Sequence, residues 1–282
     1  MASAATILEQ ALALDAAIIK GIESVNGVPL RVTTMTVCVS TSSSASTSSA
    51  STSIPLSYFI GAFNDPLIED EKRRFFNDED GHLELRATDG TTSRQFNNCL
   101  IFYHSCSGKK TKTAIKLFCN GTIHITGLAT ICATLRLAER FTALVAFLTA
   151  MPFVVKDFSI QLINAHFKLP TYLALAPMYN LMLQESEHLC RYNQEKHAGL
   201  IVQMLVPKED GTELQKISVI VFESGNVLLS AFVTAAQMLE AYTFITEFIE
   251  KHPAVMRCMP EAKAASASAS GNFDYSKFLI LK

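Results

Sequence analysis

The sequence has no excess of positive charge and no long uncharged apolar stretch. Lysine and arginine number 24 against 26 aspartates and glutamates, which gives a formal net charge of −2. A protein that attracts nucleic acid through its overall field is therefore excluded, and any such contact must come from one local face. No run of 18 or more apolar residues lacks charge, so we predict no membrane span and no membrane partner. The apolar start carries Glu9 and Asp15 and no basic leader, which predicts a short amphipathic helix and not a signal peptide.

The sequence also lacks the short motifs of common enzymes and metal sites. It contains no G-x-S-x-G, phosphate-binding loop, dinucleotide fingerprint or H-E-x-x-H. The spacing of His188, Cys190 and His197 fits no standard zinc site, and the acidic clusters 69–71 and 78–80 are typical of a solvated loop. The seven cysteines include no C-x-x-C, which favours reduced thiols in an intracellular protein. We expect no enzyme activity, cofactor, metal or small-molecule substrate.

Three segments differ in composition from the rest of the chain. Residues 40–53 are almost entirely Ser, Thr and Ala, and residues 262–271 are similar, so both read as flexible. Residues 64–94 are rich in charge and turn formers, which predicts a loop insertion with one short helix around 67–76. The tail 272–282 has aromatic and aliphatic residues after a flexible tether, and it either docks back or binds a partner.

The remaining sequence repeats itself at a constant offset of 104 residues. The pairs at this offset are Phe118 with Phe222, Gly121 with Gly225, Thr126 with Ser230 and Leu135 with Leu239. The preceding strands also correspond, Leu100-Ile101 with Leu200-Ile201. A repeat of this length indicates a duplicated module. We expect a helical extension over 1–26, a first repeat over 27–150, a second repeat over 151–252 and a linker with tail over 253–282.

Each repeat reads as antiparallel strands followed by one helix. Period-two alternation over 218–222 and 226–230 predicts strands. Helical spacing joins Leu135, Ala138, Phe141 and Leu144-Val145 in one stripe, and Met238, Tyr242, Ile245 and Phe248-Ile249 in another. The predicted fold is α+β, a pseudo-twofold duplicated antiparallel sheet with helices on one face. The other face stays bare, and function is expected there.

In its order of elements the sequence resembles the TATA-box-binding protein family, in a divergent form similar to those of large DNA viruses. The second repeat follows the family order through Phe158–Gln161, Phe167–Pro170, Ala198–Ile201 and Val219–Ser230, and the first matches at Leu30–Thr36, Phe96–Asn98 and Ile115–Gly127. The resemblance spans roughly residues 27–251 outside the insertions. It implies a saddle with helices on the convex side, whose concave face binds and bends double-stranded DNA in an A·T-rich minor groove; the handling of DNA by this family is a standard example of minor-groove kinking.

The resemblance also implies which residues would contact DNA. Pairs of aromatic wedges facing each other across each hairpin would unstack base steps, and they fall at Phe96 with Phe118 and at His197 with Phe222. The other DNA-binding positions that we carry over are Thr34, Lys116, His124, Thr126, Asn164, Leu228 and Ser230. The first-repeat counterpart of Asn164 falls at Val32 or Thr33.

The sequence departs from the family in its basic residues. Family strands carry Arg or Lys beside the wedges. The matching positions of this chain carry uncharged residues, which are Phe102, Thr122, Gln203 and Asn226. Lys116 is the one basic residue expected on the bare face, and Lys109, Lys110 and Lys112 lie at a hairpin tip, where they either reach a DNA backbone or stay solvated.

The expected function is therefore transcription initiation, with a factor IIB-like protein and RNA polymerase as partners. The resemblance places the factor IIB-type contact at Tyr192 and Glu195. An intracellular location follows, with the host nucleus, a cytoplasmic viral factory and the virion left open. The alternative is a protein of the same fold with weak or lost DNA binding, which acts as a scaffold in a transcription complex or particle.

Overall fold

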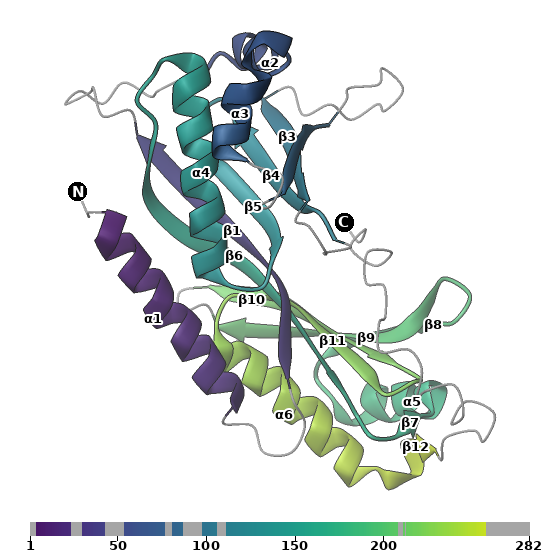
Figure 1. Ribbon diagram of the computed structural model, residues 1–282. Helices are drawn as coiled ribbons and strands as arrows, with labels where there is room; N and C mark the ends of the chain where they lie inside the picture. Colours follow the sequence, from purple (N-terminus) through teal and green to yellow (C-terminus); the bar gives the residue numbers. More distant parts are fainter. Residues whose placement is uncertain are drawn as a thin grey trace. The chain divides into compact units, whose positions relative to one another are not determined.

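A computed structural model describes residues 4–23, 30–42, 54–76, 81–86, 98–105, 111–207, 211 and 213–257. Phe96, Lys109, Lys110 and the tail 272–282 lie outside these residues. The chain divides into two compact units (Figure 1), Met1–Ile19 with Val32–Ile163, and Lys20–Arg31 with Asn164–Lys282. Within the described residues, no helix is long and apolar enough to cross a membrane.

The first unit is an antiparallel sheet with helices. Its strands follow the order β2-β3-β4-β5-β1, and β6 comes next to β1. Their bounds are β1 Arg31–Ser42, β2 His82–Leu85, β3 Cys99–Ser105, β4 Thr113–Phe118, β5 Ile123–Leu128 and β6 Val154–Lys168. The helices are α1 Ala4–Glu23, α2 Leu56–Phe63, the 3-10 turn Pro66–Ile68, α3 Glu69–Phe75 and α4 Ile131–Thr149.

The second unit repeats this plan. The end of β6 continues into the order β6-β11-β10-β9-β8, and a two-stranded sheet joins β12 to β7. The elements are β7 Tyr172–Leu173, α5 Leu175–Glu185, β8 Leu189–Asn193, β9 His197–Pro207, β10 Leu214–Phe222, β11 Asn226–Phe232, α6 Ala235–Lys251, the 3-10 turn Pro253–Val255 and β12 Met256–Arg257. The α+β class and the duplication are confirmed.

The strand registers show how closely the two units correspond. In the first unit Ala114 pairs with Thr126 and Lys116 with His124. Adding 104 to each number gives two pairs of the second unit, Ser218 with Ser230 and Ile220 with Leu228. A one-residue slip would turn every side chain to the opposite face of the sheet. Equivalent residues of the two repeats therefore lie on the equivalent face of their own sheets.

The offset also holds for backbone features that do not depend on packing. Gly121 and Gly225 have φ values of 85° and 80° in the turns between equivalent strands, and Gly127 at 117° corresponds to Ala231 at 70°. Positive φ costs glycine little and strains other residues. Ala231 therefore keeps a backbone bend at a position where the first repeat has a glycine.

Both long helices begin at equivalent caps. The Thr130 hydroxyl accepts a hydrogen bond from Ala133 N at 3.2 Å, and Thr234 accepts one from Gln237 N at 3.2 Å. Threonine at this position satisfies one of the backbone N–H groups that the first turn of a helix leaves without a partner. The predicted apolar stripes of α4 and α6 are confirmed, because each of their members is buried.

The buried face of each sheet is the one that its helix covers. Phe102 of β3 lies 5.2 Å from Phe141 of α4 between ring centroids, and Phe167 of β6 lies 4.7 Å from Tyr242 of α6. Figure 1 shows α4 lying along its sheet. Side chains alternate along the strands, so the residues between these buried positions point to the other face.

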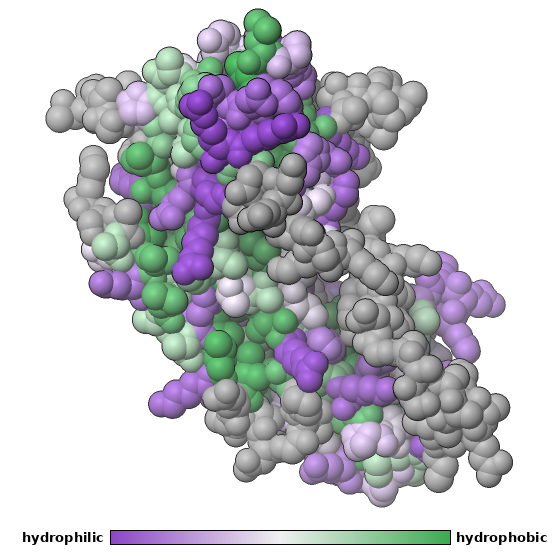
Figure 2. All heavy atoms as spheres, in the orientation of Figure 1, coloured by the Kyte–Doolittle hydropathy of each residue, from purple (hydrophilic) through white to green (hydrophobic). Residues whose placement is uncertain are grey.

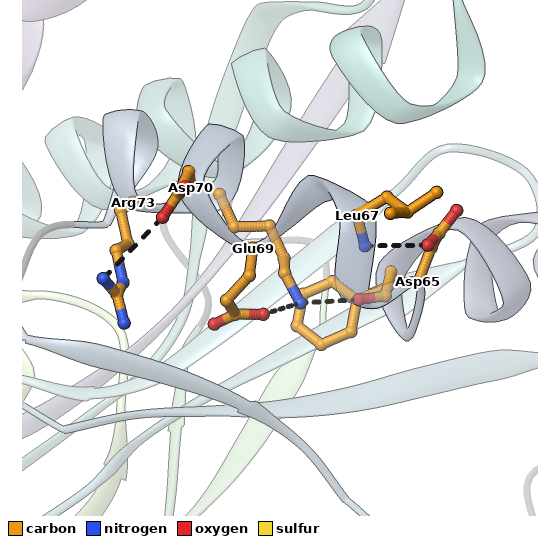
Figure 3. A network of polar contacts seen from close by, with 7 residues as sticks. Asp65, Leu67, Glu69, Asp70 and Arg73 are labelled. Atoms are coloured by element: carbon orange, nitrogen blue, oxygen red, sulfur yellow. Dashed lines mark hydrogen bonds and ion pairs between the residues drawn. The ribbon is translucent and has the colours of Figure 1, made fainter.

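The charged segment after residue 64 is not only a loop, which corrects our expectation. It contains α3 within the predicted span, and it also contains β2, which pairs with β3 and buries Leu83. Figure 3 shows the polar contacts that order its helical part. Asp65 accepts a hydrogen bond from Leu67 N at 2.9 Å, and Lys72 reaches Glu69 at 2.5 Å. Such local contacts, together with the buried leucine, allow a charged sequence to adopt regular structure.

The N-terminal helix α1 is held on α4 by a carboxylate. Asp15 is only 9% exposed, and its two oxygens accept hydrogen bonds from Ile131 N at 2.8 Å and Cys132 N at 2.9 Å. Those are the first two residues of α4, where backbone N–H groups lack partners and the helix dipole favours a negative charge. Asp15 and Thr130 together cap the start of α4.

Candidate nucleic-acid interface

We call the sheet face opposite α4 the first open face and the face opposite α6 the second open face. The strand alternation gives their members. The first open face carries Thr34, Thr36, Cys38, Cys99, Ile101, Tyr103, Ala114, Lys116, Phe118, His124 and Thr126. The second carries Asn164, His166, Lys168, His197, Gly199, Ile201, Gln203, Leu205, Lys216, Ser218, Ile220, Phe222, Asn226, Leu228 and Ser230.

Phe118 lies half-buried on the first open face, but its partner is not the predicted one. The register places Cys99 opposite Phe118, whereas the prediction placed Phe96 there. The partner of Phe118 thus lies three residues further along β3 than we assumed, in line with the pairing of His104 with Thr113. The ring of Phe118 instead lies beside His124 on the neighbouring strand, with 4.9 Å between ring centroids.

Phe222 lies on the second open face and is 8% exposed. Gly199, not His197, is directly opposite it, so the predicted pairing was wrong by two residues. His197 still lies on the same face, with 6.2 Å between the ring centroids of His197 and Phe222. A diagonal neighbour two residues along a strand remains within reach of an aromatic ring.

Gly199 makes room for this aromatic pair. A Cβ atom at Gly199 would lie 2.8 Å from Ile220 Cγ2 and 3.2 Å from both His197 Cε1 and Phe222 Cε1. The backbone of Gly199 also holds the imidazole, because Gly199 N donates to His197 Nδ1 at 3.0 Å. Each open face thus carries a phenylalanine with a histidine ring beside it.

A polar pair joins neighbouring strands at equivalent places in the two units. Thr36 and Thr126 share a hydrogen bond of 2.9 Å between their hydroxyls, and the Ser230 hydroxyl donates to Asn164 Oδ1 at 2.8 Å. Because Ser230 is the repeat equivalent of Thr126, the counterpart of Asn164 is Thr36. The prediction of Val32 or Thr33 was wrong, because it miscounted the strand by several residues.

The remaining predicted positions fall on the two open faces. Thr34 is half-buried on β1, and Leu228 is half-buried on β11 opposite Ile220. Lys116 lies opposite His124 in the ladder. Burial, with a smaller contribution from the Lys116 charge, lowers the pKa of His124 below its ordinary value, so the neutral imidazole is favoured.

The charges on the open faces are few and mostly basic. Lys116 is not the only basic residue there, because Lys216, opposite Leu205 on β9, and Arg191, opposite Ile201, also face this side. The first open face also carries an acidic side chain at its edge, because Glu84 of β2 lies opposite Tyr103. Glu84 accepts a hydrogen bond from Lys112 at 2.6 Å. The hairpin-tip lysine Lys112 is therefore engaged within the protein.

The two predicted partner-binding residues lie beside the edge strand of the second unit. Tyr192 of β8 is half-buried, with its ring 6.2 Å from that of Tyr179 on α5. Glu195 is exposed in the following turn, where its backbone N–H donates to Asn193 Oδ1 at 3.1 Å. His188 packs against Phe244, and no group of metal-ligating side chains gathers within the described ranges.

Comparison with known proteins gives limited likenesses. The chain matches no protein-family model and no curated protein sequence. Among solved structures it is similar to Methanococcus jannaschii TBP, with 16% identity over 79% of this chain and 98% of that chain, at a TM-score of 0.46. It is also similar to a structure of M. kandleri SerRS in complex with A. aeolicus tRNASec, with 15% identity over 78% of this chain and 29% of that chain, at a TM-score of 0.25. These values are too low to place the chain in a family.

Proposed function

We propose that the protein binds double-stranded DNA through its two open faces and acts in transcription initiation. The observation that carries this proposal is the composition of those faces. Each has a phenylalanine beside a histidine, a small hydroxyl or amide pair and apolar neighbours, and the acidic side chain at the edge of the first face, Glu84, is paired with Lys112. An A·T-rich minor groove shows mainly acceptors, which suits such a surface better than a strongly charged one.

Phe118 and Phe222 are the proposed wedges. Inserting an aromatic side chain between base steps costs roughly a few kcal/mol per step, which the added contact area of bent DNA offsets. Thr126, Ser230 and Asn164 would line the groove as small polar groups. His124 and His197, which flank the wedges, would extend the stacked surface on each side.

The resemblance of the sequence to the TATA-box-binding family supports the same proposal and adds partners to it. A factor IIB-like protein would contact Tyr192 and Glu195, and RNA polymerase would join through that factor. The second candidate is a scaffold role with little DNA binding. The small number of basic residues on the open faces favours this second candidate, because phosphate contacts supply much of the affinity of DNA-binding proteins.

Binding and bending of an A·T-rich duplex separate the two candidates. We expect Phe118→Ala with Phe222→Ala to weaken binding at least about tenfold, which corresponds to ~1.4 kcal/mol, and to abolish bending measured by energy transfer between end labels. Phe147→Ala is the matched control, because Phe147 is 45% exposed on α4, away from the open face. Equal binding by all variants, or none by the wild type at low salt, would favour the scaffold role.

A further inference from the structure

A pocket lies in the second unit, next to the turn that follows the proposed wedge Phe222. Its volume is about 290 Å³. Its lining comes from the end of β6, the loop that follows and the turn between β10 and β11: Lys168, Leu169, Pro170, Thr171, Tyr172 and Ser224. Three of these residues carry hydroxyl groups and one carries an ammonium group. The Thr171 hydroxyl is used within the protein, because it donates to Tyr172 O and Arg257 O, both at 3.2 Å. The ammonium group of Lys168 and the hydroxyl of Ser224 are the polar groups on which the following argument rests.

Backbone hydrogen bonds fix the two walls of the pocket against each other. Leu169 N donates to Gly225 O at 2.9 Å, and Leu173 N donates to Glu223 O at 2.9 Å. Gly225 allows this close approach, since a Cβ there would lie 2.2 Å from Thr171 O. The end of β6, with Lys168, is thereby held against the start of β11.

Lys168 lies beside a position at which the resemblance leads us to expect a basic residue. Resemblance to the TATA-box-binding family implies a Lys or Arg at position 226, and the chain has Asn226. Asn164 and Ser230 bond across β6 and β11 four residues from Lys168 and Asn226, which places these two residues side by side. The positive charge has moved to the adjacent strand.

The donors and charges of the pocket suit an anion. Asn226 Nδ2 donates to Ser224 Oγ at 2.8 Å, so the hydroxyl hydrogen of Ser224 is directed to another acceptor. The acidic side chain nearby, Glu223, lies 3.7 Å from Arg257 and is balanced by it. Lys168, which is exposed, adds a positive charge beyond that balance.

We propose that Lys168 and Ser224 bind a phosphodiester of the DNA backbone next to the base step that Phe222 opens. The inference rests on the proposed DNA binding, and it adds a phosphate contact at a residue that the resemblance does not indicate. A backbone phosphate carries a negative charge that complements the ammonium group of Lys168, and it accepts hydrogen bonds from both groups. A contact of this kind fixes position on the duplex and carries no base specificity.

The salt dependence of binding tests this contact. Lys168→Gln is expected to reduce the slope of log affinity against log salt by about 0.9, because one fewer phosphate is neutralised. Lys251→Gln is the control, since Lys251 lies on α6 and pairs with Glu185 at 2.6 Å. Asn226→Lys in the Lys168→Gln background should restore the slope, because it returns the charge one strand away.

The outcomes distinguish this inference from the proposed function. A wild-type protein that does not bind duplex DNA would overturn both. Wild-type binding with an unchanged slope in Lys168→Gln would overturn the phosphate contact alone and leave DNA binding intact. If Lys168→Gln reduced the slope but Asn226→Lys did not restore it, in variants with wild-type circular dichroism, the placement of Lys168 beside position 226 would be overturned.

Discussion

Replacing Asp15 by alanine should destabilise the first unit by about 3 kcal/mol. The carboxylate holds two backbone N–H groups, those of Ile131 and Cys132. Ile131 is fully buried, so its N–H would lose its partner without gaining water, at a cost of ~2 kcal/mol. Cys132 is half-buried and can be rehydrated, so its loss adds less, while the loss of negative charge at a helix start adds ~0.5 kcal/mol.

Asp15→Asn should cost about half as much, because it keeps one acceptor oxygen and the side-chain shape. Glu9→Gln is the control: Glu9 is exposed on the same helix, and we expect a change below ~0.5 kcal/mol. Chemical unfolding gives the free energies, and hydrogen exchange at Ile131 and Cys132 locates the effect. If Asp15→Ala were as stable as Glu9→Gln, and if hydrogen exchange at Ile131 and Cys132 were unchanged, the capping role of Asp15 would be refuted.

Three further predictions concern the turns and a histidine. Gly225→Ala should destabilise the second unit by several kcal/mol, roughly 3 or more, because the new Cβ would meet Thr171 O; a wild-type thermal midpoint would contradict this. Ala231→Gly should raise the free energy of unfolding by about 0.5 kcal/mol, since Gly127 shows which residue this bend prefers, and a loss of stability would argue against strain there. Burial lowers the pKa of His124, so the unfolded chain takes up the proton first as pH falls below about 6.5, and stability should drop. His124→Gln should reduce that drop. Free energies of unfolding measured about one pH unit above and below that value would show the difference.

The duplication and the helix-covered sheets could be predicted from the sequence because they depend on patterns along the chain. The offset of 104 residues between Phe118 and Phe222 indicated the two repeats, and the spacing of apolar residues predicted the buried faces of α4 and α6. These signals depend on burial, which a single sequence records well.

The details of pairing could not be predicted from the same signals. Strand register depends on where a hairpin turns, and counting from a guessed turn misplaced the partners of Phe118 and Phe222. The neighbours of Lys168 depend on the pairing of β6 with β11, far away in the sequence. Nothing in the local sequence around Asn226 indicates a lysine on the next strand.

The shared register of the two halves has a practical use. Each residue in one β4–β5 or β10–β11 pair shows which side chain occupies the equivalent backbone site in the other half, as alanine at 231 stands where the first half has glycine at 127. The protein thus contains its own two-member alignment. Exchanging equivalent half-buried side chains, such as His124 with Leu228, would transfer the chemistry of one half to the same backbone site of the other.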